Sequence, residues 1–126
     1  MVAAGHDVAE VGAPSEDSYD YPDASDLVAE AVLGGTAERG VLLCGSGIGV
    51  SIRANRYPGI RAALCTTPQL AELARAHNQA NVLCMGARVL SQSEAEAILA
   101  AFLTAEPEEN PRHERRIAKL DAPLKC

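Results

Sequence analysis

A short apolar strand that runs directly into a glycine-rich turn constrains the fold of this chain more than any other feature. The stretch G-V-L-L-C-G-S-G-I-G-V-S covers residues 40–51, and its apolar run Val41–Leu43 ends at Cys44. Three glycines follow, and residues 48–55 can then form a helix. A strand, a tight turn and a helix in this order are typical of α/β folds, in which the turn places Cys44 at a sheet edge. Glycine amides and a helix N-terminus at that edge favour an anion and the loss of a thiol proton.

Length, composition and charge narrow the class of protein further. The 126 residues are enough for one domain, so we expect a single domain over residues 1–126, with residues 106–126 as a C-terminal helical arm. Hydrophobic residues make up 48% of the chain but aromatic residues only 3%, so the core must be aliphatic. The net charge of -6 argues against nucleic-acid binding by a basic surface, although local arginines can still hold a small anion.

The chain carries no sequence signal for a membrane or for secretion. No apolar run approaches the roughly 20 residues that span a bilayer, and residues 1–7 lack the basic and apolar parts of a signal peptide. We therefore expect a cytoplasmic protein with no membrane partner.

The four cysteines are expected to be free thiols. They are Cys44, Cys65, Cys84 and Cys126. None belongs to a C-x-x-C pair, and their spacing does not suggest zinc. In a reducing compartment no disulfide is expected, and the apolar runs around Cys65 and Cys84 predict small buried hydrophobic side chains.

Apolar runs and helical segments alternate along the chain. The apolar runs predict strands over residues 8–11, 41–43, 60–64 and 82–85. Helices are expected over residues 24–33, 48–55, 68–76, 91–105 and 112–120, with loops over residues 12–23 and 106–111. This alternation predicts an α/β domain with a parallel sheet. Ligands bind at the carboxyl ends of such strands, where Cys44, Cys65–Thr66 and Gly86–Arg88 are expected.

The glycine spacing separates this turn from two common nucleotide-binding loops. Gly45, Gly47 and Gly49 run G-x-G-x-G, whereas a dinucleotide-binding turn needs glycine or alanine where Val50 stands. No Gly-Lys-Ser/Thr follows, as a P-loop would require. A tight strand-to-helix connection without any chemistry is the alternative that spacing alone leaves open.

A histidine and an asparagine stand together at the end of the helix expected over residues 68–76. His77 is followed by Asn78, and two further amide side chains lie within the next three residues. A histidine favoured by the helix dipole and an asparagine that ends the helix would explain the pair structurally. Only together with the other motifs does the pair indicate a site.

Three arginines are candidates for holding a phosphate. Arg88 follows the strand expected at residues 82–85, and Arg112 and Arg116 lie four residues apart on one helix face. The planar fork of arginine offers paired donors to phosphate. The alternative is a solvated basic face that pairs with Glu108, Glu109 and Glu114, and for Arg115 we prefer this alternative.

Together these segments resemble the ribose-5-phosphate isomerase B and galactose-6-phosphate isomerase family of sugar-phosphate isomerases. The matching stretches cover residues 20–23, 44–55, 59–65, 73–83, 86–89 and 112–116. The resemblance implies a Rossmann-like three-layer α/β/α fold with a five-stranded parallel sheet, of which about four strands are present here. It implies catalysis without a metal or any other cofactor.

The resemblance also implies the catalytic residues. Cys44 would be the base that moves a proton between C1 and C2 of the sugar through an enediol. Ser46 would lie in the loop that contacts the enediolate, together with Gly45, Gly47 and Gly49. His77 would open the sugar ring.

The resemblance further implies how the substrate is held. Asn78 would bind sugar hydroxyls, Tyr21 would lie near the site, and the phosphate ligands would be Arg88, Arg112 and Arg116. The family implies a homodimer whose sites are shared between subunits, with a tetramer as the alternative. The expected substrates are ribose 5-phosphate and ribulose 5-phosphate. Galactose 6-phosphate or allose 6-phosphate, a non-catalytic sugar-phosphate-binding subunit and, third, a nucleotide-dependent oxidoreductase are the alternatives.

The resemblance breaks at the N-terminus. Relatives begin with a strand and helix that this sequence lacks, and that strand ends in a Ser-Asp-His-Ala-Gly motif whose Asp and His line the site. A start codon downstream of the true one, a fragment, and a degenerate paralogue that uses another chain's strand are three explanations, of which we favour the first. We expect these 126 residues, expressed alone, to be poorly soluble or inactive.

Overall fold

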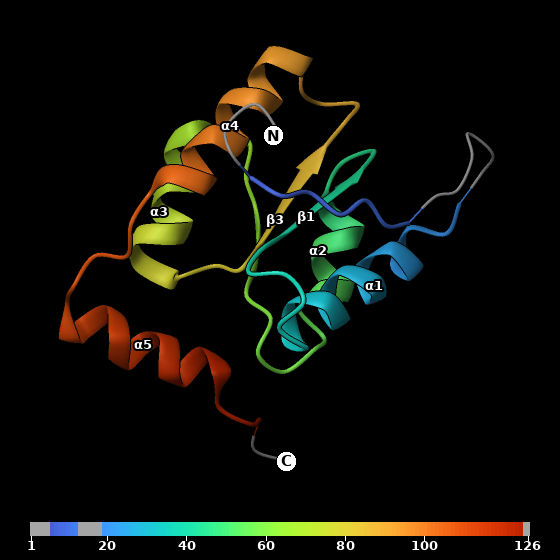
Figure 1. Ribbon diagram of the computed structural model, residues 1–126. Helices are drawn as coiled ribbons and strands as arrows, with labels where there is room; N and C mark the ends of the chain where they lie inside the picture. Colours follow the sequence, from blue (N-terminus) through green and yellow to red (C-terminus); the bar gives the residue numbers. More distant parts are fainter. Residues whose placement is uncertain (1–5, 13–18, 125–126) are drawn as a thin grey trace.

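The computed structural model describes residues 6–12 and 19–124, and Figure 1 shows how its elements are arranged. The strands are β1 (Gly40–Cys44), β2 (Ala62–Leu64) and β3 (Val82–Gly86). The helices are α1 (Tyr21–Leu33), α2 (Ile48–Ala54), α3 (Pro68–Asn78), α4 (Gln92–Thr104) and α5 (Pro111–Asp121). The strands form a parallel sheet in the order β1-β3-β2, in which Cys44 pairs with Gly86 and Leu64 with Cys84. The carboxyl ends of the strands therefore meet at one edge of the sheet.

The helices form a layer on each face of this sheet. Figure 1 shows α1 and α2 on one side of the strands and α3 and α4 on the other, while α5 extends below α3. The three-layer α/β/α architecture with a C-terminal helical arm is thereby confirmed.

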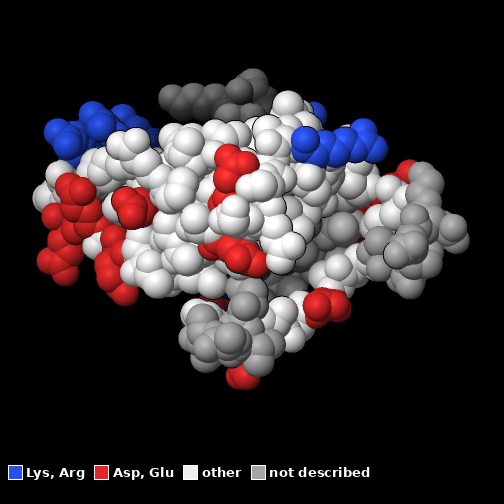
Figure 2. Space-filling view, turned by 90° about the horizontal axis from the view of Figure 1, so that it is seen from above, with Lys and Arg blue, Asp and Glu red and all other residues white. Residues whose placement is uncertain are grey.

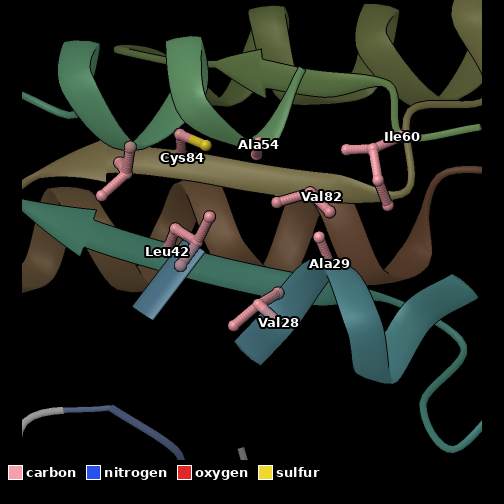
Figure 3. Close-up of a cluster of buried hydrophobic side chains, with 8 residues drawn as sticks. Val28, Ala29, Leu42, Ala54, Ile60, Val82 and Cys84 are labelled. Carbon is pink, nitrogen blue, oxygen red and sulfur yellow. The ribbon is translucent and has the colours of Figure 1, made fainter. Parts of the chain in front are cut away.

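Aliphatic side chains fill both faces of the sheet. On one face Val28 and Ala29 of α1 pack against Leu42 and Val82, as Figure 3 shows. On the other face the core is built around Phe102, the single phenylalanine of the chain, which is fully buried on α4. The expected aliphatic core is therefore present, and β3 lies in its centre because all five of its residues are buried.

Local sequence signals set the starts of the helices on the second face. The Thr67 hydroxyl accepts a hydrogen bond from the Leu70 amide at 3.2 Å, and Pro68 occupies the first turn of α3. Ser91 and Glu94 form a reciprocal capping box at the start of α4. Both starts agree with the expectation from sequence.

Two expected elements differ in the structure. The run at residues 8–11 forms no strand, because Val8 and Val11 are 40% and 52% exposed and its backbone joins no ladder. The sheet thus has three strands among the described residues, rather than about four. The loop expected at residues 12–23 ends early, since α1 already begins at Tyr21 with Pro22 in its first turn. Residues 13–18 of that loop lie outside the described residues.

None of the helices that the structure describes combines the length and the apolar character that a membrane crossing requires.

Candidate active site

The Cys44 thiol stands in a loop whose amides turn toward it. β1 delivers Cys44 to the carboxyl edge of the sheet, and its sulfur accepts a hydrogen bond from the Gly47 amide at 3.2 Å. Gly47 has a φ of 81°, and a Cβ there would lie 2.6 Å from Leu64 Cδ1. A side chain at this position would therefore be strained and would collide with the ends of β2 and β3. We call residues 44–49 the cysteine loop.

The cysteine loop lowers the pKa of its thiol. Partial burial raises the pKa of Cys44, but the backbone amides of Val50, Gly47, Ser46 and Gly49 together outweigh burial and hold it below its ordinary value of 9.0. The other two described cysteines behave in the opposite way. Burial alone raises the pKa of Cys65 to about 11, and mainly burial raises that of Cys84 to about 12. Their expected role as buried hydrophobic side chains is confirmed, and Cys126 lies outside the described residues.

The loop that follows β3 meets the cysteine loop. The Ala87 amide donates to the Cys44 carbonyl at 2.8 Å, and the Arg88 amide donates to the Gly45 carbonyl at 3.0 Å. The Arg88 side chain lies across Gly45, since its Cδ would be 3.3 Å from a Cβ there. Ser46 is exposed, and its hydroxyl accepts from the Ile48 amide at 3.2 Å. An exposed guanidinium therefore lies against the cysteine loop, and an exposed hydroxyl is part of it.

Tyr21 closes the far side of the cysteine loop. Its ring lies on Gly49 so closely that a Cβ at this glycine would overlap the ring. An open hollow of about 410 Å³ runs past Tyr21, Gly49 and Arg53, and another of about 260 Å³ lies beside Gly86 and Ala87. Neither of these two hollows is lined by Cys44, so neither encloses a ligand over the thiol.

His77 and Asn78 lie at the other edge of the sheet. α3 runs back across the face of the sheet and ends at Asn78, and residues 79–81 lead directly into the amino end of β3. The His77 side chain is 38% exposed and its Nε2 lies 3.2 Å from a Glu108 carboxylate oxygen. Its ring stacks on that of His113 with centroids 4.2 Å apart.

The α5 arginines belong to the same edge as His77. Figure 1 shows α5 next to the end of α3 and away from the carboxyl ends of the strands. Arg112 and Arg116 are exposed and one turn apart on this helix, as expected, while His113 between them faces α3 and is buried.

The predicted site residues thus fall into two groups. The carboxyl-edge group comprises Tyr21, Cys44, Gly45, Ser46, Gly47, Gly49 and Arg88. The amino-edge group comprises His77, Asn78, Arg112 and Arg116. The five residues of β3 separate the two edges by roughly 13 Å, so one chain does not bring Cys44 and His77 into contact.

Comparison with known proteins identifies the family. The sequence matches the family model described as Ribose/Galactose Isomerase over residues 1–120. The chain belongs to the ribose/galactose isomerase family. It is 42% identical to the ribose-5-phosphate isomerase B of Escherichia coli over 122 residues, which are 97% of this chain and 81% of that one.

Solved structures support the membership in this isomerase family. The structure aligns with the ribose-5-phosphate isomerase B of Clostridium thermocellum with a TM-score of 0.92 and 42% identity, over 95% of this chain and 80% of that one. The enzyme of Mycoplasma genitalium, solved with bound ribulose 5-phosphate, gives a TM-score of 0.90 and 39% identity with the same coverage. The predicted resemblance and the Rossmann-like fold are both confirmed.

The carboxyl edge of this isomerase fold carries little positive charge. Figure 2 looks onto the molecule from above, toward this edge, and its described part is largely uncharged, with acidic residues scattered over it and basic residues near its margins. A phosphate bound there would depend on single arginines rather than on a broad basic surface.

Sequence reasoning missed one residue of the amino edge. From the sequence, Glu108 is only one partner of the arginines in the alternative of a solvated basic face. In the structure its carboxylate bridges the two stacked histidines, with one oxygen 3.2 Å from His77 Nε2 and the other 3.4 Å from His113 Nε2. The Glu108 amide also donates to the Ala76 carbonyl at 2.9 Å, which fixes residues 106–110 beside the end of α3. No local pattern could have revealed this contact, because it joins segments far apart in the sequence.

Proposed function

We propose that this chain is an aldose–ketose isomerase that interconverts ribose 5-phosphate and ribulose 5-phosphate. Membership in the ribose/galactose isomerase family and the names of its relatives support this substrate class. The observation that carries the mechanism is the Cys44 thiol, whose pKa is lowered by backbone amides at the carboxyl edge of the sheet. A base with a pKa nearer to neutrality is what proton transfer from carbon requires.

The proposed reaction begins with opening of the sugar ring by His77. The Cys44 thiolate then takes the proton from C2 of the open-chain aldose, and the electron pair forms a double bond between C1 and C2 while the carbonyl oxygen becomes an enediolate. Amides of the cysteine loop are the donors for that oxygen, each worth about 3 kcal/mol of the barrier. Return of the proton from Cys44 to C1, with transfer of the hydroxyl proton from O2 to O1 as the C2 carbonyl forms, gives the ketose.

The phosphate does not react and serves as a handle. We propose that Arg88, Arg112 and Arg116 bind it, because exposed guanidiniums form paired, charge-assisted hydrogen bonds with phosphate oxygens. Asn78 is proposed to bind sugar hydroxyls. Holding the far end of the substrate in this way orients C1 and C2 against the thiolate.

The separation of the two groups supports a shared site. Since Cys44 and His77 lie at opposite edges of one chain, we propose a homodimer in which the amino-edge group of one protomer completes the carboxyl-edge group of its partner. A tetramer would contain the same pairs. The cytoplasmic location expected from the sequence stays a prediction.

Substitution of Cys44 tests the function. In the full gene product, Cys44→Ala should lower kcat for ribose 5-phosphate by at least about 100-fold, with KM nearly unchanged. Cys65→Ala is the matched control, because this thiol is buried and its pKa is raised, and it should keep near wild-type turnover. Full turnover in Cys44→Ala would show that the base lies elsewhere.

Assays of the wild-type protein distinguish the remaining alternative functions. A non-catalytic binding subunit would bind ribulose 5-phosphate, measured by calorimetry, without turning it over. Ranking kcat/KM for ribose 5-phosphate, galactose 6-phosphate and allose 6-phosphate on the same preparation identifies the preferred sugar.

A further inference from the structure

Two imidazoles and a carboxylate converge where α3, the following linker and α5 meet. His77 ends α3, Glu108 lies in the segment between α4 and α5, and His113 lies in the first turns of α5. His77 Nε2 is 3.2 Å from Glu108 Oε2, and His113 Nε2 is 3.4 Å from Glu108 Oε1. One ligand atom from each residue lies within 4.8 Å of the other two. The cluster is thus preassembled by tertiary packing.

One nitrogen of the buried imidazole of this cluster, His113 Nε2, lacks a hydrogen-bond partner. The His113 side chain is only 9% exposed, and its Nε2 is fully buried. Its 3.4 Å contact with Glu108 lacks hydrogen-bond geometry, so the nitrogen is unsatisfied. A buried polar atom without a partner destabilises the fold, and such atoms usually have a structural or functional reason.

We propose that His77, Glu108 and His113 bind a divalent transition-metal ion, with Zn²⁺ as the best fit. Two imidazole nitrogens and one carboxylate oxygen are a ligand set that zinc takes in tetrahedral sites, with a fourth position left for water or substrate. Mg²⁺ and Ca²⁺ prefer sites made of oxygen ligands only. The buried Nε2 of His113 would gain the partner that it lacks.

The three ligand atoms need to move only slightly closer together to hold the ion. Zinc–nitrogen bonds of about 2.0–2.1 Å at tetrahedral angles place two ligand nitrogens about 3.4 Å apart. His113 is fixed by burial, whereas the side chains of His77 and Glu108 are 38% and 49% exposed and can turn toward it. The tether between the Glu108 amide and the Ala76 carbonyl keeps the carboxylate within reach.

Metal binding at this cluster would oppose catalysis. An ion on His77 Nε2 removes the lone pair that ring opening needs, so Zn²⁺ is expected to inhibit and sugar phosphate to protect. This consequence rests on the proposed function of His77, whereas the metal site itself does not. Binding and inhibition are therefore measured separately.

The binding test uses Zn²⁺ and Co²⁺ with the full gene product in a Cys44→Ser background, which removes the reactive thiol. Competition with a chromophoric chelator should give one Zn²⁺ per chain, and bound Co²⁺ should show the visible bands of a tetrahedral site without thiolate charge transfer. Glu108→Gln and His113→Asn should each weaken Zn²⁺ binding at least about tenfold. His6→Asn, which alters the remaining histidine of the chain, should leave it unchanged.

Each outcome decides the proposal. Glu108 is half-exposed, so Glu108→Gln should keep the wild-type circular dichroism even if His113→Asn does not fold. Any of three results would overturn the metal site. They are zinc binding that is unchanged in Glu108→Gln, Co²⁺ spectra that show thiolate charge transfer, and zinc binding without a defined stoichiometry. Binding without inhibition would uphold the site and argue against the role proposed for His77.

Discussion

At the scale of single residues, the environment of each described cysteine separates one thiol whose pKa is lowered from two whose pKa is raised. Cys44 is partly buried among amides of its own loop, whereas Cys65 and Cys84 are enclosed by aliphatic side chains. Amides stabilise the thiolate and aliphatic packing disfavours it. The pKa of the same residue type is therefore shifted in opposite directions at positions that differ in their surroundings.

Alkylation as a function of pH should report this difference. The iodoacetamide rate at Cys44 should rise with the thiolate fraction, with a midpoint below 9.0, because the pKa of this thiol is lowered. Native Cys65 and Cys84 should stay unmodified over the same range because they are buried and their pKa values are raised. Peptide mass spectrometry measures each site separately. A Cys44 midpoint at or above 9.0 would contradict the role of the loop amides.

Neighbouring arginines on α5 provide a matched test of phosphate binding. Arg116→Ala should raise KM for ribose 5-phosphate at least about tenfold, since one charge-assisted hydrogen bond is worth about 1.5–3 kcal/mol. Arg115→Ala removes the same charge from the adjacent exposed position and should change KM little. If steady-state assays give the same KM for the two variants, the change is an effect of net charge and Arg116 lies outside the site.

At the scale of elements, the close approach of α1 and α2 positions the cysteine loop. The Tyr21 ring packs on Gly49 in the first turn of α2, and the Ser25 hydroxyl donates to the Val50 carbonyl at 3.2 Å. α1 thereby fixes the segment whose amides face the sulfur. The same helix begins earlier than its apolar periodicity indicates, which places Tyr21 on the helix rather than in a loop.

A double-mutant cycle should measure this contact. Gly49→Ala should lower the free energy of unfolding by about 1–3 kcal/mol, because its Cβ overlaps the Tyr21 ring. In a Tyr21→Ala background the same substitution should be neutral or stabilise by up to about 1 kcal/mol, since alanine favours helix more than glycine does. Urea denaturation of the four chains measures the cycle. Additive effects would mean that the ring does not pack on Gly49.

At the scale of the whole molecule, the two edges of the sheet carry the two groups of predicted site residues, which we propose to be the two halves of a shared site. A thiol base without a ring-opening imidazole, or the reverse, cannot carry out the full proposed reaction. β1 also lies at the edge of the described sheet, with Leu43 of β1 56% exposed. The expectation that these 126 residues alone are poorly soluble or inactive stays a prediction.

Mixing two inactive variants should test the sharing of sites. Cys44→Ala and His77→Asn homodimers should each be nearly inactive. Co-expression in equal amounts should yield half heterodimers, each with one intact site, and therefore about a quarter of wild-type activity. Separately purified variants assayed before subunit exchange serve as the control. If the activity after subunit exchange stays at the level of the two parent variants, each complete site lies within one chain.

Local patterns in the sequence determined which segments are regular and how they are joined. Continuous apolar runs predicted all three observed strands, and the caps at Thr67 and Ser91 predicted two helix starts, because these signals act over a few residues. The prediction of a strand at residues 8–11 was wrong, because a strand must also pair with a neighbouring strand and its own sequence does not specify that partner.

Tertiary structure alone decided which side chains meet. The sequence by itself selected Cys44, His77 and the arginines, but only the fold showed that the thiol and the imidazole lie at opposite edges of the sheet. Only the fold brought the Glu108 carboxylate within reach of the Nε2 atoms of both histidines. Contacts between distant segments depend on the packing of whole elements, and no short-range pattern records that packing.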